Sequence, residues 1–288
     1  MISSMTGYAT VARELAQGVL TLELKSVNGR FLDVQFRMAE DLRSVEPGLR
    51  DLVTAAIGRG KVDCRLNFAA APLARGEVAL NRDVVERLAR LSQAVRDALP
   101  DAQPLRVNDV LHWPGVLGDE AAGAEALREA AVAVMRAALA ELGAARARDG
   151  ERLAAMIRER VARIRARLAE LEPLVPQAIA AYEEKLAAKL REVMGAGDED
   201  RIRQEIAVFG VRIDVAEELS RLATHLDEVE RVLSAGGAVG KRLDFLMQEL
   251  NREANTLGSK SVSKELSAAA LEFKLAIEQM REQVQNLE

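Results

Sequence analysis

Cysteine, aromatic residues and long apolar runs are scarce in this sequence. Its 288 residues include one cysteine, Cys64, and aromatic residues make up 3%. A single cysteine excludes an intramolecular disulfide and a cysteine-based zinc cluster within one chain. Cys64 has alternating polar and apolar neighbours, so we expect its side chain to be buried in a strand. Base stacking on so few rings would add little to nucleic-acid binding. No apolar run approaches the roughly 20 residues of a bilayer span, so no membrane contact is expected.

Features of an export signal are also missing from residues 1–18, which have neither a cationic start nor a continuous apolar stretch. We therefore expect a soluble, cytoplasmic protein. The net charge of −5 argues against a protein that coats a polyanion over its whole surface. Any nucleic-acid binding is expected to be confined to local basic patches.

The N-terminal part of the chain alternates apolar and polar residues, as half-buried strands do. Two such runs within residues 18–38 flank Asn28 and Gly29, a dipeptide that favours the type I′ turn of a β-hairpin. Residues 40–60 then take helical spacing, and alternation returns in 61–70. We predict an α+β fold that begins with an antiparallel or mixed sheet and one packed helix.

From residue 81 onward the spacing of apolar residues is almost entirely helical. Residues 123–195 predict two long helices that meet near Pro173 and Pro176, and residues 201–234 predict one further helix. Glycine-containing breaks over residues 235–240 and 258–263 separate the helices that follow. Three regions are expected: 1–75 as an N-terminal α+β domain, 76–200 as a long-helix arm or coiled hairpin, and 201–288 as an all-α C-terminal domain.

A stripe of polar residues repeats at i, i+4, i+7 and i+11 in the predicted helix over 201–234. Its members are Asp214, Glu218, Arg221 and His225. This spacing aligns them along one side of a helix, at the border of the leucine face, so they are expected to be half-buried. One interpretation is a row of surface ion pairs. The other is a group that holds a divalent cation or moves a proton near a phosphate.

The next predicted helix carries Glu249 and Glu253 one turn apart. Two carboxylates at i and i+4 repel each other unless a cation lies between them. Either Arg242, which shares their side of the helix, or a metal ion would offset this repulsion. A solvated helix face is the alternative.

The segment 236–242 resembles a phosphate-binding loop only superficially. Its spacing is one residue short, Arg242 replaces the expected Ser or Thr, and a helix precedes it instead of a strand. Nucleotide binding by that route is therefore rejected. Glycines before Lys241 and Arg242 would still leave N–H groups beside cations, which suits an RNA phosphate, and Lys260 has a similar setting.

Arginines are concentrated between residues 146 and 167, where eight of them occur with three acidic residues. Arg160, Arg163 and Arg167 share one helix face, so a basic path for RNA is one interpretation. A bias of composition toward alanine and arginine would give the same pattern, and both interpretations stay open.

Four segments of the chain resemble the bacterial YicC/YloC family: residues 4–9, 24–38, 212–225 and 240–261. The middle of the chain, about 75 to 200, resembles the family only in being helical and charged. The resemblance implies an endoribonuclease that acts on single-stranded RNA with a divalent metal, within a ring-like homo-oligomer that is a hexamer. Its acidic and histidine positions correspond here to Asp214, Glu217, Glu218, His225, Glu249 and Glu253, and its basic positions to Arg221, Arg242, Arg252 and Lys260.

We therefore expect metal-dependent hydrolysis of RNA by the C-terminal domain. The expected ligands of Mg²⁺ or Mn²⁺ are Asp214, Glu218, Glu249 and Glu253. The expected catalytic residues are His225, Glu217 and Arg221, and the expected RNA contacts are Arg242, Arg252, Lys260, Lys241 and Arg30. Two alternatives remain, namely metal-free cleavage in which His225 deprotonates the RNA 2′-hydroxyl, and a non-catalytic RNA-binding adaptor. The composite metal site requires the stripe of 214–225 to face the helix of Glu249 and Glu253.

Overall fold

The computed structural model describes residues 2–15, 18–70, 80–116, 120–194 and 198–288. The chain forms two compact units, one of Tyr8–Leu142 and the other of Met1–Gly7 with Gly143–Glu288. The α+β class with a mixed N-terminal sheet and an all-helical C-terminal region is confirmed. The domain boundaries expected near residues 75 and 200 stay a prediction.

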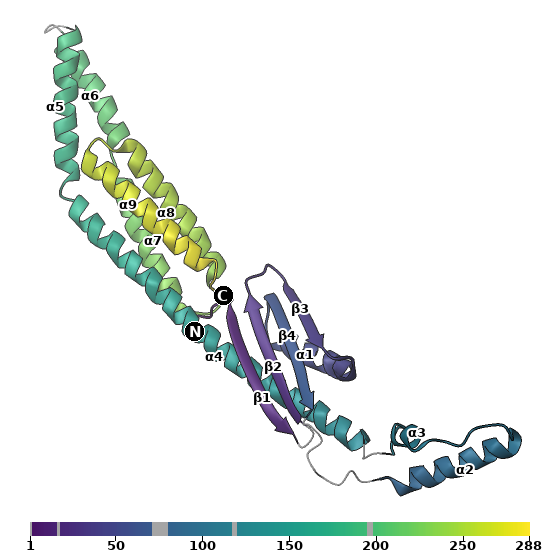
Figure 1. Ribbon diagram of the computed structural model, residues 1–288. Helices are drawn as coiled ribbons and strands as arrows, with labels where there is room; N and C mark the ends of the chain where they lie inside the picture. The colour runs from purple at the N-terminus through teal and green to yellow at the C-terminus, as the bar shows by residue number, and fades with distance from the viewer. Residues whose placement is uncertain (1, 16–17, 71–79, 117–119, 195–197) are drawn as a thin grey trace. The chain divides into compact units, whose positions relative to one another are not determined.

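The unit of Tyr8–Leu142 is built on a four-stranded mixed sheet (Figure 1). Its strand order is β1-β2-β4-β3, in which β2 pairs antiparallel with β4 and β3 pairs parallel with β4. The strands are β1 (Gly7–Leu15), β2 (Gly18–Val27), β3 (Leu32–Met38) and β4 (Gly60–Ala70). The predicted hairpin between β2 and β3 is therefore wrong, because β4 lies between these two strands.

The loop between β2 and β3 explains why its Asn-Gly pair gives no hairpin turn. Neither Asn28 nor Gly29 has the positive φ that a type I′ turn requires. A Cβ atom on Gly29 would lie 3.2 Å from the backbone of Gly60. The glycine thus permits the close approach of this loop to the start of β4, and the N–H of Gly60 donates to the carbonyl of Phe31 at 3.2 Å.

One face of this sheet carries the core of the unit. Leu22 and Leu24 of β2 and Cys64 of β4 are fully buried, because alternate residues of adjacent strands point to the same face. They pack with α1 (Glu46–Ala56) and with the part of α4 (Glu120–Leu171) that precedes Gly143. Cys64 is buried in a strand as predicted, and burial raises the pKa of its thiol to about 12. The remaining helices are η1 (Glu40–Val45), α2 (Arg82–Ala98) and α3 (Val107–Leu111).

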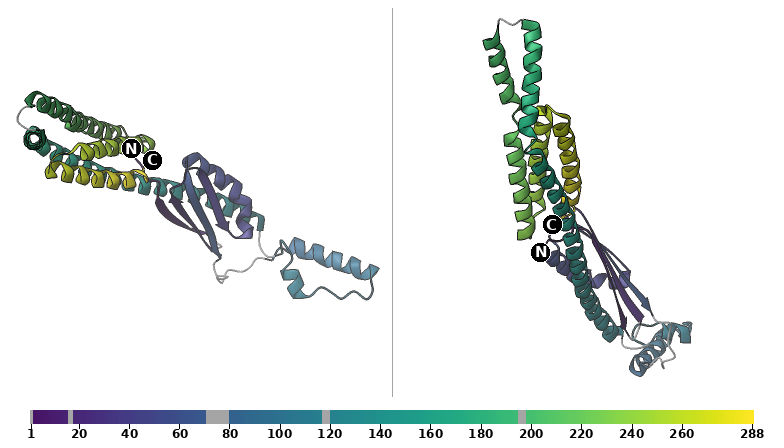
Figure 2. Two further views of the ribbon diagram at one scale, coloured as in Figure 1. Left: turned by 90° about the horizontal axis from the view of Figure 1, so that it is seen from above. Right: turned by 90° about the vertical axis from the view of Figure 1, so that its left-hand side faces the viewer.

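The described part of the other unit is helical apart from an isolated β-bridge at the chain ends. The part of α4 that follows Leu142 packs with α7, α8 and α9 around one apolar core, and α5 and α6 form a neighbouring helix pair (Figure 2). The helix pair near Pro173 is confirmed, since α4 ends at Leu171 and α5 follows. The bounds are α5 (Val175–Met194), α6 (Glu199–Ile213), α7 (Ala216–Ala235), α8 (Gly240–Lys260) and α9 (Lys264–Val284).

The single helix predicted over residues 201–234 is wrong, because the chain breaks at Asp214. The backbone of Asp214 is extended, with ψ of 125°, and its carboxylate accepts the N–H of Ala216 at 2.9 Å. An aspartate that satisfies a free N–H at a helix start favours a new helix there. α8 also continues through Gly258 to Lys260, beyond the break predicted at that glycine.

Among the described residues, no helix combines the length and the apolar character needed to cross a bilayer.

Candidate functional site

The helices α7 and α8 form an antiparallel pair whose inner faces are apolar. Leu222 and Leu226 of α7 and Leu243 and Leu250 of α8 are fully buried. The two helices run antiparallel, because Glu218 near the start of α7 contacts Lys260 at the end of α8. The short connection around Gly236 and Gly237, with φ of 68° and 82°, confirms the predicted glycine break.

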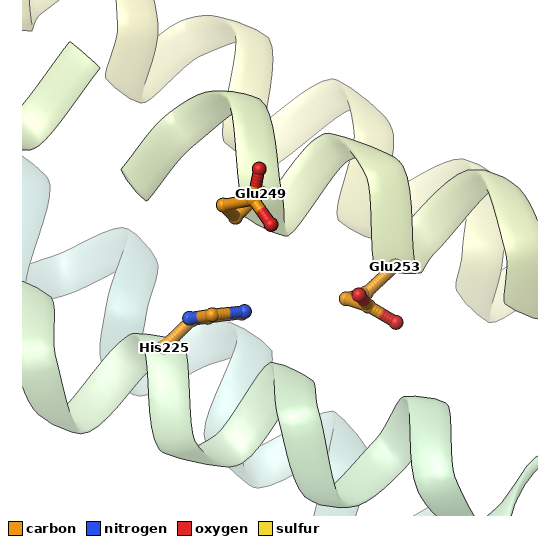
Figure 3. Close-up of side chains that lie close together, drawn as sticks. All are labelled: His225, Glu249 and Glu253. Carbon is orange, nitrogen blue, oxygen red and sulfur yellow. The ribbon is translucent and has the colours of Figure 1, made fainter. Parts of the chain in front are cut away.

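Four polar contacts run along one border of this pair, and we call them the α7–α8 seam. Glu218 Oε1 lies 2.9 Å from Lys260 Nζ, and Arg221 Nη1 lies 3.6 Å from Glu253 Oε1. His225 faces Glu249 and Glu253 (Figure 3). Arg242 Nη2 lies 3.1 Å from Glu228 Oε1. The stripe predicted from helical spacing therefore faces α8 from Glu218 onward, within one chain.

The centre of the seam is the group of His225, Glu249 and Glu253. One donor atom from each residue lies within 4.8 Å of the other two, and Figure 3 shows the imidazole and both carboxylates directed toward the space between α7 and α8. Glu253 is buried, with 4% of its surface exposed. The side chains of His225 and Glu249 have no hydrogen bond or ion pair with any other residue that the structure describes. The side chains of His225 and Glu249 thus remain available to a ligand, whereas Glu253 also pairs with Arg221.

The charges around these two glutamates are only partly compensated. Of the cations in the described ranges, Arg221 alone is within ion-pair distance of either carboxylate, and it also pairs with Glu217. Arg242 does not lie between Glu249 and Glu253, since it contacts Glu228. Two carboxylates on successive helical turns therefore remain a favourable place for a further positive charge.

The donor set fits a divalent cation. Two ligands on opposite sides of Mg²⁺ or Mn²⁺ lie about 4.2 Å apart, since each bond is about 2.1 Å. The donor atoms of the three residues lie within 4.8 Å of one another, and small rotations of the side chains would bring them within about 4.2 Å. Mg²⁺ prefers oxygen ligands, whereas an imidazole with two carboxylates is a donor set of later transition metals and Mn²⁺.

The structure does not bring Asp214 or Glu218 into this group. Asp214 is exposed, and its carboxylate caps the start of α7. Glu218 is 6% exposed and pairs with Lys260, whose Nζ also donates to the carbonyl of Asp214 at 3.0 Å. The Oε2 atom of Glu218 is buried without a hydrogen-bond partner. These residues connect the first turn of α7 to the last turn of α8.

The predicted RNA contacts have different surroundings. Lys241 and Arg252 are exposed, and neither has an ion pair within the described part of the chain. Arg242 is held by Glu228. A bidentate hydrogen bond from Arg231, with a further one from Arg242, lowers the pKa of Glu228 to about 2. Arg30, in the other unit, lies 5.3 Å from the ring centre of Phe31.

Three arginines of α4 contact neighbouring helices, whereas Arg163 of the same region is exposed. Arg160 donates to Gln279 of α9 at 3.2 Å, and Arg167 lies 3.6 Å from Glu272 of the same helix. Arg165 contacts Glu230 of α7 at 3.2 Å. The face of Arg160 and Arg167 therefore meets acidic and amide partners of its own chain instead of forming an uninterrupted basic path.

Comparison with known proteins gives a consistent result over the whole chain. The family described as "Endoribonuclease YicC-like, N-terminal region" matches residues 2–155, and "Endoribonuclease YicC-like, C-terminal" matches residues 171–288. A protein of Haemophilus influenzae named "Probable endoribonuclease YicC" is 36% identical over 288 residues, which cover all of both chains. A protein of Clostridioides difficile with the same name is 26% identical over 295 residues, again over all of both chains.

Proposed function

Since the chain belongs to the YicC-like endoribonuclease family, we propose that it cleaves phosphodiester bonds within single-stranded RNA in the cytoplasm. The observation that carries the choice of site is the group of His225, Glu249 and Glu253 at the centre of the α7–α8 seam. These side chains converge while two of them have no partner among the described residues. Polar groups in a buried or half-buried position that lack a partner call for an explanation, and a bound ion is one.

We propose that His225, Glu249 and Glu253 hold a divalent cation. When bound, this cation would supply a water of lowered pKa and shield the charge of the phosphate. The imidazole makes Mn²⁺ the preferred choice over Mg²⁺. In this proposal Asp214 and Glu218 have a positioning role, because their contacts are with the backbone at Ala216 and with Lys260.

The remaining residues of the seam would bind and orient RNA. Arg221 is half exposed and lies at the edge of the group between Glu217 and Glu253, so its guanidinium can turn toward a scissile phosphate. Glu217 would hold it there. Lys241, Arg242 and Arg252 would add local positive charge along α8, which suits a protein whose overall charge is negative.

A homo-oligomer, in the form of a hexameric ring, is part of the proposed function. Support comes from large apolar side chains on the outer surface of α8 and α9, since Phe245 is 50%, Leu271 69% and Leu275 62% exposed. Apolar surface of this kind commonly marks an interface. Sedimentation of the wild type and of Leu271→Glu with Leu275→Glu tests this assembly, and a smaller mass for the variant is expected.

The ends of the RNA products distinguish the chemical routes. We expect 5′-phosphate ends, formed with Mn²⁺ and absent in chelator. Products with 2′,3′-cyclic phosphate that persist in chelator would instead support the metal-free route, in which His225 deprotonates the 2′-hydroxyl. Binding of RNA without cleavage under any metal condition would contradict the enzymatic proposal and favour an adaptor.

A further inference from the structure

A groove of about 700 Å³ lies between α5 and the start of α9. One wall is formed by Leu174, which precedes α5, and by a face of α5 that includes Ala178, Tyr182 and Lys185. Val262 to Glu265 form the other wall. Both walls belong to the unit that contains the α7–α8 seam.

The groove combines an apolar wall with unpaired cations. Tyr182 is half-buried and contributes its ring, and Leu174 and Ala178 continue the same surface. Lys185 and Lys264 are exposed, and neither forms an ion pair with a residue in the described ranges. A ring beside cations is the combination with which proteins bind single-stranded nucleic acid, because the ring stacks a base and the cations contact the backbone.

The start of α9 itself does not offer a phosphate site. The Ser263 hydroxyl accepts the N–H of Leu266 at 3.2 Å. The Glu265 carboxylate is bound by its own N–H and by the Ser263 hydroxyl, which lowers the pKa of Glu265. This carboxylate would repel a compact, multiply charged anion. A single strand of RNA, with one charge per nucleotide and an apolar base face, fits the groove better. The groove is lined by two cations, Lys185 and Lys264, against the one carboxylate of Glu265.

One wall of the groove follows the α7–α8 seam directly in the chain. Lys260, the last residue of α8, is followed by Ser261 and then by Val262 of the groove wall. From Glu253 to Lys260 the helix rises by about 10 Å, at ~1.5 Å per residue. An RNA strand at the proposed cleavage site would cover this distance with roughly three nucleotides, at about 3.4 Å per stacked nucleotide.

We propose that this groove binds single-stranded RNA outside the cleavage site, with one base stacked on Tyr182 and the adjoining phosphates held by Lys185 and Lys264. This inference rests on the proposed function, because the ligand of the groove is the same RNA that the cleavage site would bind. The groove would give that RNA a second point of contact. Long RNA should use the groove, whereas an RNA that covers only His225, Glu249 and Glu253 should not.

The test uses the full-length chain and 2′-O-methyl oligouridylates in chelator, so that neither cleavage route operates. Fluorescence anisotropy at several salt concentrations gives the slope of log affinity against log salt. We expect Lys185→Ala with Lys264→Ala to reduce this slope for long RNA by about 1.4, because each lost phosphate contact contributes about 0.7. Tyr182→Leu should weaken binding of long RNA more than Tyr182→Phe, which keeps the ring.

Lys189→Ala is the matched control, because Lys189 is an exposed lysine on α5 that does not line the groove. A slope reduced by about 0.7 for Lys189→Ala, which is the value of one phosphate contact, or no change for the double variant, overturns the proposal. A change of oligomeric mass in the double variant, with RNA binding intact, would identify the groove as a contact between copies and also overturns it.

Cleavage of short RNA separates this inference from the proposed function. If the groove variants cut short RNA at the wild-type rate and bind long RNA with the reduced slope, both proposals are supported. If the wild type cuts no RNA while the slope still falls in the double variant, the groove stands and the enzymatic proposal fails.

Discussion

The ammonium group of Lys260 lies 2.9 Å from the Glu218 carboxylate, so the last turn of α8 is tied to the first turn of α7. The sequence suggested Glu218 as a metal ligand and Lys260 as an RNA contact. Their mutual pairing, and the bond from Lys260 to the carbonyl of Asp214, indicate instead that they set the register of the α7–α8 pair. His225 and Glu249 lie further along the same pair and depend on that register.

The Lys260→Met variant should be less stable than the wild type. Glu218 is 6% exposed, and removing its partner leaves a buried carboxylate uncompensated, at a cost of about 2–3 kcal/mol. Urea unfolding measures this loss. Lys274→Met, at an exposed lysine of α9, should cost much less.

A second replacement checks the physical reason for this loss. In Lys260→Met combined with Glu218→Leu no buried charge remains, so much of the lost stability should return. Unchanged stability of Lys260→Met alone would mean that the pair does not hold the helices.

Metal affinity should depend on the three residues of the central group. We expect His225→Ala, Glu249→Gln and Glu253→Gln each to weaken Mn²⁺ binding by at least about tenfold, because each removes one donor atom. Isothermal titration calorimetry at pH 7 measures the affinity. Glu282→Gln on α9 makes the same chemical change at an exposed residue outside the seam and should bind Mn²⁺ like the wild type. Equal affinity in all four variants would place the ion elsewhere.

Acid should weaken the contact between the end of α7 and the start of α8. The Glu228 carboxyl has its pKa lowered from 4.5 to about 2, so it contributes stability that is fully present above pH 4.5 and is lost as the pH falls toward 2. Glu228→Gln should therefore flatten the fall of the free energy of unfolding in this interval, as measured by urea titrations at several pH values. A pH dependence identical to that of the wild type would contradict the assignment.

The local parts of the fold could be predicted from the sequence, and the pairing of distant segments could not. Alternation identified β2 and β4, and the expected start of helical spacing at residue 81 agrees with α2, which begins at Arg82. The Asn28-Gly29 signal failed because β4 inserts between β2 and β3, and turn preferences contain no information on a strand that begins some thirty residues later.

The candidate site was predictable to a similar extent. Helical spacing correctly aligned Glu218, Arg221 and His225 on the side of α7 that faces α8. The same spacing failed for Asp214, because that residue precedes α7 and its ψ of 125° is not helical. The joining of His225 with Glu249 and Glu253 depends on the antiparallel pairing of α7 and α8, which is a tertiary contact that helical periodicity does not encode.

The most direct test of the central claim is the rate of cleavage of end-labelled single-stranded RNA in Mn²⁺ by the wild type, Glu249→Gln and the matched Glu282→Gln. If the α7–α8 site is correct, Glu249→Gln should cleave at least about a hundredfold more slowly than the wild type, because it lacks one proposed ligand of the divalent cation. Glu282→Gln should cleave at the wild-type rate. Cleavage by Glu249→Gln at the wild-type rate would contradict the assignment of this site.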